Sequence, residues 1–189
     1  MPEILMTKTR TILAISFAAI FAISMIMSPV YAGGHLAIDN AKMTIKQKKG
    51  EIDLKIKVGA KIPKDESGLF GWALLGWEKT LVVVTHVPAF DDSDFDDKKG
   101  AFHSHVLGLT SEADCASNLK IDPDVDITDP GYKTKVGKDK IKVKKVPLAD
   151  LGDKVGDAVL TGFFITPENG NLCINPAGGF VTPDVKLKK

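Results

Sequence analysis

The sequence has almost no arginine: among its 25 lysine and arginine residues the only arginine is Arg10, which lies near the N-terminus. The guanidinium group is the usual side chain for bidentate contacts to phosphate and guanine, so this absence disfavours nucleic-acid and nucleotide binding. Glycine-rich phosphate loops, the Gly-x-Ser-x-Gly turn, the His-Glu-x-x-His helix and the Cys-x-x-Cys-His haem motif are missing too. We therefore expect no nucleic-acid partner and no haem, nucleotide or flavin cofactor.

The N-terminal segment has the features of an export signal. Lys8 and Arg10 precede an uncharged, mostly apolar run at residues 11–27, and Val30 and Ala32 then give the small-x-small pattern of a signal-peptidase site. The run has 17 residues, just short of the roughly 18 that indicate a membrane-spanning helix. Residues 1–32 are predicted to be a signal peptide or, alternatively, an uncleaved N-terminal anchor helix, which would then be the protein's contact with the membrane.

The positive flank of this segment should stay inside, so residues 33–189 are predicted to form a single extracytoplasmic domain, either secreted or tethered to the outer face of the cell membrane. Without residues 1–32 the chain keeps 23 of its 25 basic and 23 of its 24 acidic residues, and all of those bases are lysines. Lysine-rich stretches such as residues 133–145 are predicted to be solvated strand faces.

Sulfur-containing residues are few. Outside the cytoplasm an even pair of cysteines is most simply a disulfide, so Cys115 and Cys173 are predicted to be bonded, with free thiols or metal ligation as alternatives. Neither His nor Met closely follows Cys173, which excludes a blue-copper site. Met43 is the only methionine after residue 32, which disfavours Met-rich copper trafficking.

Hydrophobic residues alternate with polar ones along most of the exported chain, which is typical of half-buried strands. Residues 41–62 are predicted to form a hairpin with a turn at Lys48-Lys49-Gly50. Residues 33–40 are predicted to be a tether, and residues 68–77 a strand or short helix whose two tryptophans pack in the core. Further strands are predicted at residues 80–87, 102–109, 119–127, 132–136, 140–146, 155–166 and 172–174.

Short strands without helices between them predict an all-β fold. We expect an antiparallel β-sandwich, with an Ig-like or cupredoxin-like Greek key of about 7–9 strands, behind the N-terminal hydrophobic signal or anchor helix.

The candidate chemistry lies on three histidines. His103 and His105 are two residues apart on a predicted strand, so both rings project from one face. If residues 80–87 pair antiparallel with this strand, a register that places His86 opposite His103 or His105 would bring three imidazoles together. Three neutral imidazoles within about 2.1 Å of one point suit Zn²⁺ or Cu²⁺ and leave one position open.

This arrangement resembles the His-x-His-plus-third-His pattern of metal-binding β proteins such as cupins and carbonic anhydrases. The resemblance covers only His86, His103 and His105. The competing interpretation is that these histidines are partly exposed or hydrogen-bonded structural residues of a strand end.

A strongly acidic segment lies between the histidine strands, with five carboxylates in seven residues: Asp91, Asp92, Asp94, Asp96 and Asp97. Their repulsion calls for a cation, the adjacent lysines or solvent. An EF-hand is excluded because an aspartate would replace the turn glycine and His103 the bidentate glutamate. The segment is therefore predicted to be a solvated acidic tip; the alternatives are a Ca²⁺ loop and an outer shell around an imidazole-bound metal.

Two functions follow from these patterns, and a third needs no site. The first is an exported binding module that holds Zn or Cu, with Ca less favoured, through His86, His103 and His105. The second is a metal-dependent hydrolase with water in the open position. The third is a structural or adhesion-type cell-surface domain without metal. A non-enzymatic binding or structural role is favoured, because no general base lies at a recognisable spacing; the sequence does not identify protein partners.

Overall fold

The computed structural model describes residues 34–63, 69–76, 78–85, 102–122, 124, 132–152 and 158–189. These residues belong to one contact unit, Tyr31–Lys189. The predicted signal or anchor segment lies outside the described residues. Among the described residues, no helix is long and apolar enough to cross a membrane.

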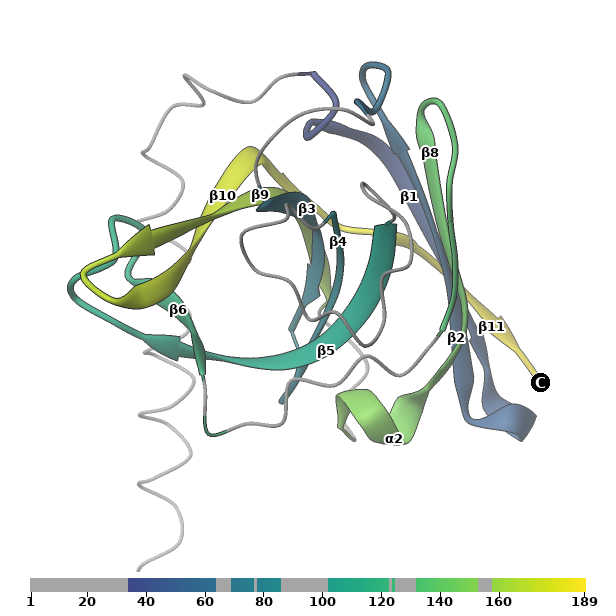
Figure 1. Ribbon diagram of the computed structural model, residues 1–189. Coiled ribbons are helices and arrows are strands. Elements are labelled where there is room, and N and C mark those ends of the chain that lie inside the picture. Colours follow the sequence, from purple (N-terminus) through teal and green to yellow (C-terminus); the bar gives the residue numbers. More distant parts are fainter. Residues whose placement is uncertain are drawn as a thin grey trace, which may run out of the picture. The chain divides into compact units, whose positions relative to one another are not determined.

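The described part of the chain is almost entirely β, as the sequence predicts (Figure 1). Five strands form one sheet, in the order β11-β1-β2-β8-β7. Their bounds are Asp184–Lys188 for β11, Ile38–Lys46 for β1, Glu51–Val58 for β2, Lys140–Pro147 for β8 and Lys133–Val136 for β7.

The other six strands close into an antiparallel barrel in the order β10-β6-β5-β4-β3-β9, with β9 paired to β10. Their bounds are Asn171–Val181 for β10, Leu119–Asp122 for β6, Phe102–Ser111 for β5, Thr80–Thr85 for β4, Leu69–Leu75 for β3 and Val159–Glu168 for β9. The expected Ig-like or cupredoxin-like sandwich thus holds only as an all-β fold, because one of the two layers is a closed barrel. The described strands number eleven, more than expected, and β11 pairs with β1 in parallel.

The hairpin predicted at residues 41–62 is present as β1 and β2. A 3-10 turn, η1 (Gln47–Lys49), connects the strands and ends at Gly50, whose φ of 59° is the left-handed conformation that glycine adopts without strain. Alternation places Met43, Leu54 and their apolar neighbours on the inner face and the lysines on the outer face. The sequence pattern therefore determines which side of this sheet is buried.

Two hydrophobic clusters hold the fold together. The larger lies between the inner face of the five-stranded sheet and the outer face of β3, β4 and β5, with Trp72, Val83 and Val106 on the barrel side. The smaller fills the barrel interior and includes Val82, Leu107 and Phe163. Because both faces of β4 are covered, all six of its residues are buried, which explains its uninterrupted apolar run.

Several local expectations need correction. Residues 34–40 are not a tether: Leu36 is fully buried in the larger cluster and β1 already begins at Ile38. The ambiguous segment is strand β3, and Trp72 lies in the core as expected, whereas Trp77 lies outside the described residues. The strand expected at residues 172–174 extends through the longer β10, and the one-turn helix α2 (Leu148–Leu151) was not expected.

Candidate functional site

The two histidines of β5 face the interior of the barrel. Val84 lies directly opposite His103, and Val82 lies directly opposite His105. Directly opposite residues share a face, and both valines belong to the interior cluster. The predicted alternation along β5 is confirmed: Leu107 lies in the interior cluster with the histidine face, whereas Phe102 and Val106 pack in the larger cluster.

The two rings meet through their Nε2 atoms. His103 Nε2 and His105 Nε2 are 2.6 Å apart, and the ring centroids are separated by 4.5 Å with an interplanar angle of 75°. At this distance one Nε2 donates a hydrogen bond to the other, since two N–H groups would repel each other. His105 is buried with 7% of its surface exposed, whereas His103 is half-buried.

The register between β4 and β5 differs from the one that the three-imidazole hypothesis needs. The partners of His103 and His105 on β4 are valines, so the register that places His86 directly opposite either of them is wrong. Instead, Thr85, the residue before His86, pairs with Phe102, the residue before His103. His86 itself lies outside the described residues, as do Asp91, Asp92, Asp94, Asp96 and Asp97.

Within the described residues, no group of three or more His, Cys, Asp or Glu side chains is placed to hold a metal ion. The described residues therefore bring together two imidazoles, His103 and His105, in an apolar surrounding. A complete tetrahedral or square site needs at least one further protein ligand from another part of the chain.

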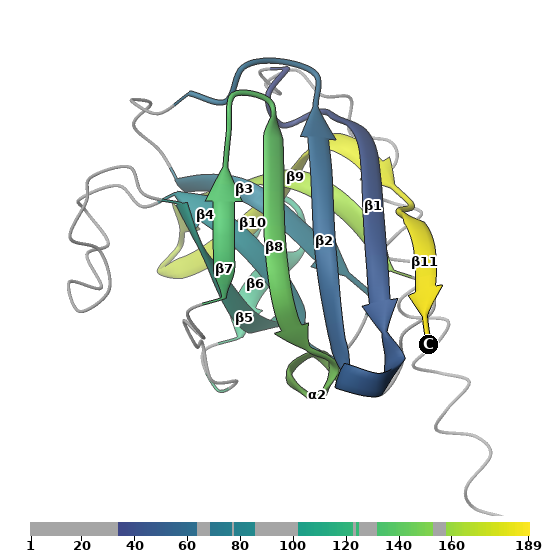
Figure 2. The ribbon, with the colours of Figure 1, turned by 90° about the vertical axis from the view of Figure 1, so that its right-hand side faces the viewer.

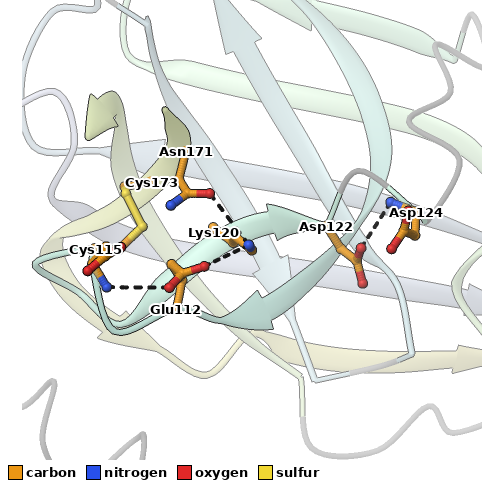
Figure 3. Close-up of polar contacts among 8 residues, drawn as sticks. Glu112, Cys115, Lys120, Asp122, Asp124, Asn171 and Cys173 are labelled. Atoms are coloured by element: carbon orange, nitrogen blue, oxygen red, sulfur yellow. Dashed lines mark hydrogen bonds and ion pairs between the residues drawn. A yellow bond between two sulfur atoms is a disulfide. The ribbon is translucent and has the colours of Figure 1, made fainter. Parts of the chain in front are cut away.

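The predicted disulfide is present. Cys115 and Cys173 are bonded, with their Cα atoms 5.5 Å apart (Figure 3). Both half-cystines are buried, Cys173 completely. A disulfide is consistent with an oxidising, extracytoplasmic location.

Polar contacts surround the disulfide. Lys120 Nζ donates to Glu112 Oε2 at 2.7 Å and to Asn171 Oδ1 at 3.4 Å, which connects β6 to β10 (Figure 3). The hydrogen bond from Lys120 lowers the pKa of Glu112 below its usual value. Nearby, the backbone N–H of Asp124 donates to Asp122 Oδ1 at 3.0 Å. These contacts join the segments around the disulfide.

Sequence reasoning missed two further polar positions in the described part. His35 is buried beside Phe70, with ring centroids 5.0 Å apart in an edge-on arrangement, so it packs outside the barrel interior. Tyr132 donates a hydrogen bond to Asp150, and burial together with this bond raises the pKa of Tyr132 above its usual range. Neither position had a motif by which the sequence could have revealed it.

Comparison with known proteins adds no relative: no family model, no curated protein and no solved structure matches the chain.

Proposed function

We propose that this protein is an exported binding module that holds a divalent metal ion, Zn²⁺ or Cu²⁺, inside one end of its β-barrel. The observation that supports the proposal is the convergence of His103 Nε2 and His105 Nε2, 2.6 Å apart, on the interior face of β5. We propose His86 as the third ligand, in agreement with its place in the chain directly after β4, the strand that pairs with β5.

The spacing of the two nitrogens is close to that of a metal site. Two Nε2 atoms that bind one tetrahedral Zn²⁺ at about 2.1 Å lie about 3.4 Å apart. The present separation of 2.6 Å therefore has to widen by less than about 1 Å, which small changes in the side-chain torsions supply. Binding would replace the hydrogen bond between the rings by two metal bonds on the same nitrogen atoms.

The surroundings also suit a site that binds tightly. Val82, Val84 and Leu107 form the walls next to the pair, so water competes little for the ion and electrostatic interactions are strong. Export supports the same function, because an extracytoplasmic domain meets metal ions without cytoplasmic buffering. The export signal in residues 1–32 and the secreted or tethered location are part of this proposal.

Metal analysis of the full chain, purified without an affinity tag, tests the proposal. We expect near-stoichiometric Zn or Cu, and a rise in melting temperature when either metal is added to stripped protein. At a free metal concentration of 100 times Kd, the stabilisation is about 2.7 kcal/mol. A protein that is free of metal and whose melting does not change with Zn²⁺ or Cu²⁺ would overturn the proposal.

A double variant and a matched control connect the metal to this pair. His103→Leu/His105→Leu keeps the apolar character of the barrel interior and is expected to fold but to lose the metal. His35→Leu removes a histidine that is also buried, but in the other cluster, and is expected to retain it. Equal retention by both variants would place the metal elsewhere.

Turnover distinguishes a binding module from a hydrolase. If the metal-loaded protein hydrolyses simple esters, and a variant lacking one aspartate of residues 91–97 does not, the enzyme hypothesis replaces the binding module. Absence of turnover with metal bound supports the non-enzymatic function.

A further inference from the structure

The outer face of the five-stranded sheet carries lysines that lie directly opposite one another. Lys135 pairs with Lys142, Lys142 with Lys55, and Lys55 with Lys42, so four lysines form one row across β7, β8, β2 and β1. We call these four residues the lysine row. Two further opposed pairs flank it, Lys57 with Lys140 and Lys133 with Lys144. Figure 2 shows the four strands side by side, with this sheet toward the viewer.

Opposed like charges destabilise a sheet unless something compensates them. In the described part of the chain no acidic side chain forms an ion pair with any member of the lysine row, although Asp184 of β11 lies directly opposite Lys42 at one end of the row. Two other acids of the same sheet pair with lysines outside the row. Asp53 accepts from Lys46 at 2.7 Å, and Asp39 pairs with Lys57 at 3.4 Å. One acid therefore stands at the Lys42 end of the row, whereas Lys55, Lys142 and Lys135 have only lysines directly opposite them, so the row carries an excess of positive charge.

The spacing of the row defines the shape of a complementary ligand. Neighbouring strands are about 4.8 Å apart, so the four ammonium groups extend over about 14 Å. A shallow hollow lies in the same face, lined by Asn40, Ile56, Ile141 and the lysines at positions 42, 55, 57, 140 and 142. A ligand with several anionic groups along an extended chain can contact the row and place one group in the hollow.

We propose that this face binds a linear anionic polysaccharide, one that carries carboxylate or sulfate groups along its length. Lysine is a hydrated point charge without the planar fork of arginine, so the face recognises charge density rather than one headgroup geometry. The lysine row contains no aromatic ring, so it offers no platform on which a nucleic-acid base could stack.

A membrane surface fits the face less well than a polysaccharide chain. In the described part of the chain the exposed large hydrophobic residues are Val185 and Leu187 on β11. They lie directly opposite Met43 and Ile45 and so share the inner face, which leaves the lysine face without an apolar side chain that could insert into lipid. The proposal does not depend on the histidine pair, which lies in the other layer.

Binding to heparin, used as a sulfated polysaccharide probe, tests the proposal with the full chain at several salt concentrations. We expect the variant Lys42→Gln/Lys55→Gln/Lys135→Gln/Lys142→Gln to lose at least tenfold in affinity. The slope of log K against log salt should fall by about three. The control Lys48→Gln/Lys49→Gln/Lys61→Gln/Lys189→Gln changes the net charge equally at exposed lysines outside the opposed pairs and should stay within about twofold of the parent.

Three outcomes would overturn the proposal. The parent protein could fail to bind heparin and polygalacturonate. The two quadruple variants could lose affinity equally, which would reduce the effect to net charge. Vesicles containing phosphatidylglycerol or duplex DNA could bind more tightly than either polysaccharide, which would identify a different partner. Because the row variant removes repulsion, its melting temperature should not fall, so lost binding cannot be assigned to unfolding.

Discussion

Replacement of Cys115 and Cys173 by alanine is expected to lower the free energy of unfolding by about 4 kcal/mol and to open the barrel first at one seam. The two cysteines are 58 residues apart in the sequence. In the chain-entropy model, a closed loop of this length restricts the unfolded chain enough to stabilise the fold by about 4 kcal/mol.

The position of the bond explains why the loss should begin locally. The barrel closes between β10 and the four-residue β6, and these strands pair in register at Cys173 and Lys120. Other contacts across the seam include Ser117 Oγ donating to the Ile174 carbonyl at 2.6 Å and Lys120 Nζ donating to Asn171 at 3.4 Å. Hydrogen bonds of this kind contribute about 1 kcal/mol each, so the disulfide is the strongest single connection at the seam.

Urea unfolding and hydrogen exchange measure the two parts of this prediction. The double alanine variant, and the parent protein under reducing conditions, should show a lower urea midpoint and faster exchange in β6 and β10, while β2 and β8 in the other sheet keep their protection. Lys120→Gln serves as control and should leave the urea midpoint nearly unchanged, because exposed ion pairs contribute little to stability. A loss below about 1 kcal/mol in the double variant, with unchanged exchange in β6, would show that non-covalent pairing alone closes the barrel.

Two further predictions concern single positions. Gly71 lies on the interior face of β3, where an added Cβ would meet the Val83 carbonyl oxygen at 2.0 Å, so Gly71→Ala should cost about 3 kcal/mol or more in urea unfolding. The control Gly137→Ala, whose Cβ would have only an ordinary contact at 3.6 Å, should change stability by less than about 1 kcal/mol, and equal effects would contradict the close approach. Because the pKa of Tyr132 is raised by burial and by Asp150, the unfolded chain loses the tyrosine proton first as the pH rises above about 10. Stability should therefore fall with rising pH above that value in the parent and fall less steeply in Tyr132→Phe, and matching slopes in urea titrations from pH 8 to 11 would refute the assignment.

The sequence predicts the parts of the fold that depend on local alternation. In β1 and β2 every outward position of the central stretch is polar and every inward position apolar, so the hairpin and its buried face follow from the period of the strand. The disulfide was predictable for a different reason, since a chain with two cysteines allows only one intramolecular pairing.

Barrel closure was not predictable in the same way, because it depends on pairing between distant segments. The sequences of β9 and β10 have the pattern of ordinary strands, and nothing in that pattern shows that β10 also pairs with β6 to close the barrel. The register between β4 and β5 is equally non-local. A shift of two residues along β4 keeps every side chain on its face, so the pattern alone does not distinguish Val84 from His86 as the partner of His103.

The histidine pair and the lysine row depart from the choices that would stabilise each layer most. Leucine at position 105 would suit the barrel interior, which is otherwise lined by residues such as Val82 and Leu107, and an acidic residue at position 55 would neutralise Lys42 and Lys142. Such departures from local consistency are expected where a protein binds something. Because the two features lie in different layers and involve different chemistry, a change in one should leave the other intact, and each proposal can fail without the other.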